Sequence, residues 1–318
     1  MSPPEGIPAA SPPLLAIVGP TASGKSRFAL EVARRFHGEV VSCDSMAVYR
    51  GMDIGTDKPG PEERASVPHH CLDLAEPGSF FSAGAFRASA MAAMDEIAGR
   101  GRLCILVGGT GLYYRALTQG LVDLPPRQEQ LRRRLKAFVE RKGPQALHRI
   151  LTRVDPGSAA RIGPADALRI VRALEVRRVT GRPLSQWIGD SPFRREGISG
   201  MLRVGITAPR ALLYQRIENR VDAMMREGFL EEVAALLGAG KLVGPARKAI
   251  GYGELAEHLE GRCPLDEAVA KTKLRSRHLA KRQLTWFRRE PEIRWYNIAE
   301  EAWPNDAIQF IQRWRQET

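Results

Sequence analysis

A glycine-rich segment of eight residues near the N-terminus constrains the fold of this chain more than any other feature. It reads Gly19-Pro20-Thr21-Ala22-Ser23-Gly24-Lys25-Ser26, follows an apolar run at 14–18 and precedes a helix-like run at 27–36. Strand, loop and helix in this order, with this spacing, are typical of a phosphate-binding P-loop. Backbone N–H groups, the helix N-terminus and Lys25 attract phosphate, and the Ser26 hydroxyl can hold Mg²⁺. The segment predicts a phosphorylated ligand at the end of a strand, without saying which ligand.

Alternation of apolar strands and amphipathic helices indicates the fold class. In the first 120 residues, strands are expected at 14–18, 39–43 and 103–107, and helices at 27–36, 83–98 and 112–117. Later, a strand is expected at 201–207, helices at 210–226, 230–237 and 265–288, and a short strand at 293–296. This pattern predicts an α/β fold, a P-loop NTPase-like parallel sheet core covered by helices on both faces.

The stretch between the two parts of the core has a different pattern. Residues 122–200 show no convincing strand, and helices are expected at 131–139, 144–151, 158–162 and 167–179. We therefore expect a disordered leader at 1–13, a core formed by 14–121 and 201–318, and a helical, RNA-binding insertion domain at 122–200.

Positive charge is concentrated in two segments outside the P-loop region. Residues 1–120 carry 11 basic and 12 acidic side chains, whereas residues 121–200 carry 17 and 8. Residues 271–289 carry 8 basic side chains and no acidic one. This asymmetry favours a polyanionic partner larger than a nucleotide, such as a nucleic acid. The alternative is that these are ordinary solvated helix faces.

Cysteine usage and hydropathy indicate the compartment. The four cysteines are far apart and form no Cys-x-x-Cys pair, which is typical of free thiols in a reducing cytoplasm. No apolar run approaches the ~20 residues of a membrane span. His69-His70-Cys71 resembles part of a metal site, but no second cluster completes four ligands, so a loop leading into a strand is favoured.

Two further strand ends carry candidate functional residues. They are Asp44-Ser45 after 39–43 and Gly108-Gly109-Thr110 after 103–107, and loops after parallel strands gather at one edge of a sheet. A typical P-loop ATPase has an aspartate at the second of these ends, where this chain has Gly108. Asp44 is the only carboxylate at these ends, and it could be a catalytic group, a helix cap or a group near Mg²⁺.

Taken together, several motifs resemble those of the tRNA dimethylallyltransferases (tRNA isopentenyltransferases). The resemblance runs from about residue 14 to residue 288. It is carried by the P-loop, Asp44-Ser45, Gly51-Met52-Asp53-Ile54-Gly55-Thr56, Pro68-His69-His70, Gly108-Gly109-Thr110-Gly111-Leu112-Tyr113, Arg172-Ala173-Leu174-Glu175, Ile250-Gly251-Tyr252, Ala280-Lys281-Arg282-Gln283 and Thr285-Trp286. A P-loop alone is shared by many families, but all these motifs in this order are specific.

The resemblance implies a prenyl transfer. A dimethylallyl group would move from dimethylallyl diphosphate to the exocyclic amine of the adenosine 3′-adjacent to a tRNA anticodon. It implies that residues 19–26 hold the diphosphate with Mg²⁺ at Ser26, that Asp44 is the base, and that Thr110 and Arg220 complete the catalytic set.

The resemblance also implies a set of tRNA contacts on the anticodon stem-loop. They are Asp44, Ser45, Met46, Ala47, Thr110, Arg169, Arg172, Lys248, Gly251, Tyr252, Lys281, Arg282, Gln283, Thr285, Trp286 and Arg288. The chain departs from the family pattern at Leu168, Gly253 and Arg277-His278. With no Cys/His pairs after Cys263, it resembles the bacterial members, and we expect a cytoplasmic monomer that does not bind membranes.

Two other readings remain open from the sequence. A P-loop kinase for a small metabolite would explain residues 1–120 but not the basic segments. An RNA-binding NTPase switch would explain the charge, but such a protein is expected to have a carboxylate at the end of strand 103–107.

Overall fold

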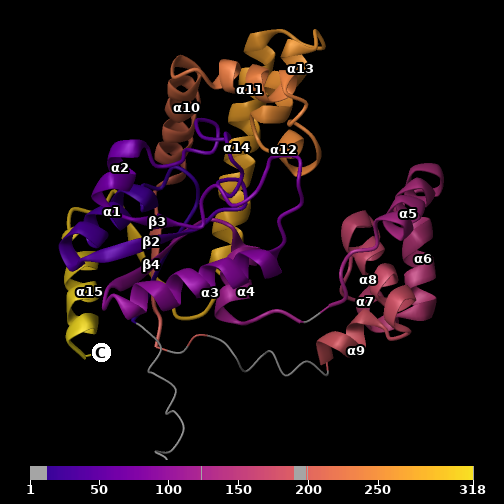
Figure 1. Cartoon of the computed structure of the whole chain (residues 1–318), viewed down its shortest axis with the longest axis horizontal. Coiled ribbons are helices and arrows are strands. Elements are labelled where there is room, and N and C mark those ends of the chain that lie inside the picture. The colour runs from indigo at the N-terminus through magenta and orange to yellow at the C-terminus, as the bar shows by residue number, and fades with distance from the viewer. Residues whose placement is uncertain (1–12, 123, 190–197, 199, 318) are drawn as a thin grey trace, which may run out of the picture. The chain divides into compact units, whose positions relative to one another are not determined.

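A six-stranded parallel sheet forms the centre of the larger of two units in the computed structural model of this chain (Figure 1). The structure describes residues 13–122, 124–189, 198 and 200–317. The core unit comprises residues 1–118 and 198–318, and the insertion unit comprises residues 119–197. The predicted leader, apart from Pro13, lies outside the described residues. None of the described helices is long and apolar enough to cross a lipid bilayer.

The strands lie in the order β3-β2-β4-β1-β5-β6, and every neighbouring pair is parallel. Their bounds are β1 Leu14–Val18, β2 Gly38–Cys43, β3 His69–His70, β4 Leu103–Gly108, β5 Leu202–Thr207 and β6 Arg294–Asn297. The predicted α/β class is confirmed. β1 lies between β4 and β5, so the loop that follows β1 leaves the middle of the sheet edge. β1 and β4 are also where the chain switches sides of the sheet, which is where ligands bind in such folds.

Side chains of β1 alternate between two apolar cores, one on each face of the sheet. Leu14, Ala16 and Val18 belong to one core, and Leu15 and Ile17 belong to the other. The first core contains side chains from α3 (Ala83–Gly99), α4 (Gly111–Thr118), α11 (Phe229–Gly238), α13 (Tyr252–Leu259) and α14 (Leu265–Phe287). The second contains side chains from α1 (Lys25–Phe36) and α15 (Asn305–Glu317). Because both faces are covered, the central strands β1 and β4 are buried, apolar runs.

The remaining helices of the core unit are short, except for α10. They are α2 (Pro61–Ser66), α10 (Arg210–Arg226) and α12 (Gly244–Lys248). Leu213 and Ile217 of α10 pack on Ala280 of α14. This contact brings the basic helix α14 against the helix that carries Arg220.

The insertion unit is helical in its described residues and has a core of its own. Its helices are α5 (Glu129–Lys142), α6 (Pro144–Val154), α7 (Pro156–Ala159), α8 (Ala167–Thr180) and α9 (Leu184–Gly189). At the centre, Glu175 accepts hydrogen bonds from Arg132 (3.0 Å), Arg172 (2.8 Å) and the backbone N–H of Gln128 (2.7 Å). Glu175 and Arg132 are buried, so this ion cluster lies inside the unit.

Most predicted helix bounds agree with the structure to within a few residues. The helix expected at 158–162 is instead α7, because Asp155 caps it by accepting from Ser158 N at 2.9 Å and Pro156 starts its first turn. The predicted strand after residues 69–71 is also corrected, since His69 and His70 themselves form β3 and Cys71 turns the chain with φ +63°.

Candidate active site

The backbone conformation of the P-loop requires glycine at two positions. Gly19 has φ +154°, and a Cβ atom there would lie 2.3 Å from the carbonyl oxygen of Ile206 on β5. Gly24 has φ +89° and immediately precedes α1. Inside the loop, the hydroxyl of Ser23 is buried and has no hydrogen-bond partner among the described residues. A buried donor without a partner is costly, and a phosphate oxygen would satisfy it.

Positive and negative side chains converge on Lys25. Its Nζ lies 3.4 Å from the carbonyl oxygen of Pro20, inside the loop. Burial lowers the pKa of Lys25 to about 8, helped by repulsion from Arg220 and opposed by Asp44 and Asp57. Arg220 donates to Asp57 at 2.9 Å across a half-exposed pair. These groups from three elements therefore share one site, which is poised for an anion.

Asp44 and Thr110 lie together at the neighbouring strand ends. Asp44 Oδ1 accepts from the backbone N–H groups of Met46 (2.7 Å) and Ala47 (3.3 Å), while Oδ2 takes part in no hydrogen bond within the described part of the chain. Thr110 Oγ1 accepts from Ser45 N at 3.1 Å. Its own N–H donates to the carbonyl oxygen of Cys43 at 3.2 Å. The loop is thus fixed, and one oxygen of Asp44 is available.

The glycine that ends β4 and a glycine that follows it are required by close contacts. A Cβ atom at Gly108 would lie 2.1 Å from the carbonyl oxygen of Cys43 on β2. The strand end where ATPases have an aspartate therefore has no room for any side chain here. At Gly111, a Cβ atom would lie 2.3 Å from the Trp286 ring.

Asp57 is positioned by a loop that Glu232 holds from α11. Glu232 accepts from three successive backbone N–H groups, those of residues 53, 54 and 55, at 2.8, 2.8 and 3.2 Å. It also accepts from the hydroxyl of Tyr252 at 2.6 Å. Sequence reasoning missed Glu232 because it lies far along the chain in an ordinary helix.

Two residues expected to touch tRNA are buried in this structure. Tyr252 is completely buried, and burial together with Glu232 raises the pKa of its hydroxyl. Gly251 has φ +89°, and a Cβ atom there would lie 2.5 Å from the Phe229 ring. In this structure both residues serve packing, and neither side chain position faces solvent.

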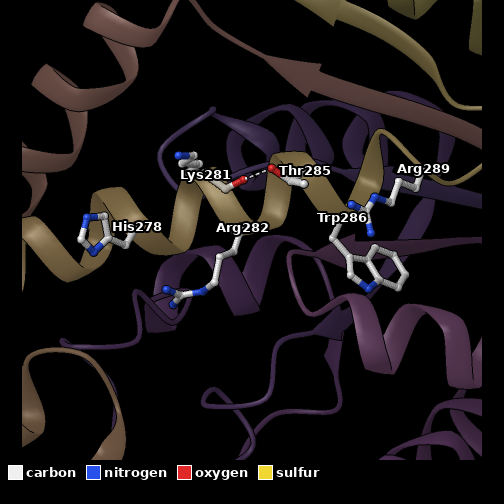
Figure 2. Close-up of a pocket in the computed structure, with 6 residues that line it drawn as sticks. All are labelled: His278, Lys281, Arg282, Thr285, Trp286 and Arg289. Carbon is white, nitrogen blue, oxygen red and sulfur yellow. Dashed lines mark hydrogen bonds between the residues drawn. The ribbon is translucent and has the colours of Figure 1, made fainter. Parts of the chain in front are cut away.

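The exposed face of α14 carries four of the predicted tRNA contacts, Lys281, Arg282, Thr285 and Trp286. A pocket of about 390 Å³ lies on this face, and Figure 2 shows the side chains that line it. Its lining consists of His278, Lys281, Arg282, Thr285, Trp286 and Arg289. The guanidinium of Arg115, on α4, lies 4.7 Å from the centre of the Trp286 ring. Cations beside an aromatic ring are typical of surfaces that bind single-stranded nucleic acid. Arg288 and Lys248 are also exposed, but Gln283 is buried.

In the insertion unit the two predicted contacts differ. The side chain of Arg169 on α8 is 75% exposed, and among the described residues its one ion pair is with Asp166 at 3.4 Å. Arg172 donates to Glu175 and to the carbonyl oxygen of Pro125, each at 2.8 Å. Arg172 therefore holds the unit together, whereas Arg169 can reach a ligand.

A magnesium ion at this site would need oxygen atoms of a bound diphosphate in addition to the protein's own ligand. Within the described residues, no group of three or more His, Cys, Asp or Glu side chains converges. Ser26 is exposed in the first turn of α1. One hydroxyl with diphosphate oxygens and water is a normal Mg²⁺ environment, because this ion keeps several waters and binds substrate phosphates.

Comparisons with known proteins agree with this geometry. The family model described as IPP transferase matches residues 47–290. A tRNA dimethylallyltransferase of Geobacter metallireducens is 51% identical over 288 residues, covering 89% of this chain and 91% of that protein. One of Thermomicrobium roseum is 44% identical, covering 95% and 91%.

Solved structures are similar as well. A full-length tRNA isopentenylpyrophosphate transferase of Bacillus halodurans has a TM-score of 0.69 and 41% identity, covering 96% of both chains. A eukaryotic dimethylallyltransferase, in structures described as acting on tRNA, has a TM-score of 0.80 and 27% identity, covering 95% of this chain and 78% of that one. Because the family model spans most of the chain and these relatives match nearly all of it, this chain belongs to the IPP transferase family.

Proposed function

We propose that this chain transfers a dimethylallyl group from dimethylallyl diphosphate to the exocyclic amine of the adenosine 3′-adjacent to the anticodon of tRNA. The observation that carries the proposal is the juxtaposition of two loops in a member of this family. One loop is a P-loop with a half-buried lysine, and the other presents a carboxylate oxygen with no hydrogen bond among the described residues.

The first loop suits the leaving group. As the allylic C–O bond breaks, negative charge builds on the departing diphosphate. P-loop N–H groups, Lys25 and the Ser23 hydroxyl stabilise that charge at one end. Arg220 is paired with Asp57 across a half-exposed contact, so it can turn to the diphosphate without leaving a buried charge behind.

Magnesium is part of the proposal. We propose that Ser26 and the diphosphate oxygens hold Mg²⁺, which would neutralise charge on the leaving group when bound. With Mg²⁺ bound, Lys25 and Arg220 still stabilise the negative charge on the departing diphosphate.

The second loop suits the acceptor. The adenine amine is a poor nucleophile because its lone pair is shared with the ring. Asp44 Oδ2 takes the amine proton as the new C–N bond forms, while Met46 N and Ala47 N fix Oδ1. The base must leave the loop stack to reach Asp44, which costs a few kcal/mol at most for a single-stranded loop base.

The exposed cations supply the remainder of the tRNA site. We propose that Lys281, Arg282, Arg288 and Lys248 of the core unit contact tRNA phosphates, and that Arg169 does so on the insertion unit. Trp286 offers a ring face beside them. We also propose that the protein works as a monomer in the cytoplasm.

Incubation of the protein with labelled dimethylallyl diphosphate and unmodified tRNA, followed by nucleoside analysis, tests the proposal. We expect label on the adenosine next to the anticodon and equal release of diphosphate. A parallel reaction with γ-labelled ATP should leave both tRNA and small acceptors unlabelled. Label transfer from ATP, or no prenylated nucleoside, would contradict the proposal.

A further inference from the structure

Gln283 is a buried polar side chain for which the mechanism above has no role. It lies on α14 beside Arg282 and between the exposed Lys281 and Thr285, yet it is only 9% exposed. A buried amide needs hydrogen-bond partners for both of its ends. Both partners of Gln283 lie on strand-end loops of the active site.

The amide of Gln283 joins the two loops directly. Its Oε1 accepts from the backbone N–H of Thr21 at 2.8 Å, inside the P-loop. Its Nε2 donates to the carbonyl oxygen of Gly109 at 3.1 Å. The next residue, Thr110, holds the loop that carries Asp44. One side chain therefore links the donor loop to the acceptor loop.

The fit requires an amide at one end and a glycine at the other. A Cβ atom at Gly109 would lie 2.1 Å from Nε2 of Gln283, so a side chain there would push the amide away from this loop. A carboxylate at residue 283 could still accept from Thr21, but it would face the carbonyl oxygen of Gly109 with no proton to donate. An aliphatic side chain would satisfy neither partner and would leave two buried polar groups unpaired.

We propose that Gln283 is a positioning residue that fixes the P-loop relative to the Thr110–Asp44 loop. It thereby sets the distance between the allylic carbon and the adenine amine. Because Gln283 lies on the helix whose exposed face carries Lys281 and Arg282, it also ties the placement of the donor to the RNA-facing helix. The inference rests on the proposed function. A misplacement of about 1 Å between reacting groups can cost about 10²-fold in rate.

Single-turnover transfer, with both substrates saturating, tests the inference. Gln283→Leu removes both hydrogen bonds, and Gln283→Glu keeps only the one from Thr21. We expect the transfer rate to fall about 10- to 100-fold in both variants. Separate titrations should give affinities for dimethylallyl diphosphate and tRNA within about threefold of the wild type, because positioning acts on kcat more than on binding.

Thr272→Val is the matched control on the same helix. Thr272 is buried and donates only to the carbonyl oxygen of Ala268 within α14, so this variant loses a buried hydrogen bond without touching either loop. It should transfer at the wild-type rate. If Gln283→Leu does not fold, Gln283→Glu alone decides.

Three outcomes would overturn the inference. The first is a normal transfer rate in the Gln283 variants beside an active wild type. The second is a loss confined to donor affinity, with the saturated rate unchanged, which would assign the amide to P-loop shape alone. The third is an equal slowing in Thr272→Val, which would assign the effect to α14 stability. A wild type that transfers no dimethylallyl group would overturn the proposed function itself, and the inference with it.

Discussion

Asp44 has the geometry of a base that acts on the acceptor. One oxygen is held by two backbone N–H groups, and the other takes part in no hydrogen bond within the described residues. Asp44→Asn preserves the shape but removes the proton acceptor. We expect single-turnover transfer to fall about 10²- to 10⁴-fold, with small changes in the affinity for either substrate. A variant that chiefly loses Mg²⁺-dependent donor binding would show that Asp44 acts near the metal instead.

Lys25 makes donor binding depend on pH. Burial and Arg220 lower its pKa to about 8, so the free site loses the lysine charge as the pH rises above 8. A bound diphosphate favours the charged form. Donor affinity should therefore be highest below pH 8 and weaken by up to about tenfold per pH unit above it. Titrations of dimethylallyl diphosphate between pH 7 and 9.5 measure this.

Lys25→Arg is the control for this pH dependence, because a guanidinium stays charged throughout the range. Its donor affinity should be flat between pH 7 and 9.5. A parallel decline in the wild type and in Lys25→Arg would show that another group titrates.

At the scale of elements, α14 combines two faces with different tasks. Its buried face holds Gln283 against the loops, and its exposed face carries Lys281 and Arg282. Reversing these two cations to glutamate should weaken binding of all tRNAs alike, because phosphate contacts carry no sequence information. If about six phosphates are bound, log K should fall by roughly 4 to 5 per decade of salt. The double reversal should reduce that slope by about 2.

Reversal of Arg35 and Arg313 provides the matched control. These exposed arginines lie on α1 and α15, the helices of the opposite sheet face, and their reversal changes the net charge equally. Filter-binding titrations at several salt concentrations compare the two pairs. Equal losses for both would mean that overall charge, not α14, attracts the tRNA.

How accurately the sequence predicted each helix depends on the length of the helix and the strength of its amphipathic pattern. α10 was predicted with its observed bounds and α14 to within one residue, because long amphipathic patterns are strong signals. The helices α2, α9, α12, α13 and α15 were missed, and four of these have eight residues or fewer. The order of the strands could not be predicted, since it depends on pairings between residues far apart in the chain.

The sequence predicted which loops form the site more accurately than it predicted which side chains face it. The P-loop, Asp44 and Thr110 lie at adjoining strand ends, as the α/β pattern predicted. Gln283 and Tyr252 were expected to touch tRNA, yet both are buried. A motif names residues without saying which face of a helix each occupies, and only packing decides that. The catalytic roles remain predictions for the variants above.

At the scale of the whole molecule, the chain consists of two units with separate cores. The core unit contains both loops of the proposed reaction, and the insertion unit contains none of the P-loop, Asp44 or Thr110. Stability and donor binding should therefore respond separately to changes in the two units. The buried Glu175 cluster offers a way to test this, because it lies wholly inside the insertion unit.

Glu175→Ala leaves Arg132 buried without its carboxylate, which typically costs about 3–5 kcal/mol. Burial by itself would raise the pKa of Glu175, but hydrogen bonds from Arg172 and Gln128 hold it below its usual value. The charged form therefore contributes stability near neutral pH. We expect the variant to unfold in two steps on heating, with only the insertion unit destabilised. Calorimetry measures the steps, and titrations should show weaker tRNA binding with unchanged donor binding.

Glu39→Ala is the counterpart in the core unit. Glu39 is a buried carboxylate that pairs with Arg100 and His70, so its loss should lower the unfolding temperature of the core unit alone. Arg100 is 45% exposed and can reach water, unlike Arg132, so the cost should be smaller than for Glu175→Ala. Loss of donor binding in Glu175→Ala at a temperature where the core unit remains folded would contradict the separation of the two units. It would mean that the insertion unit shapes the donor site as well as binding tRNA.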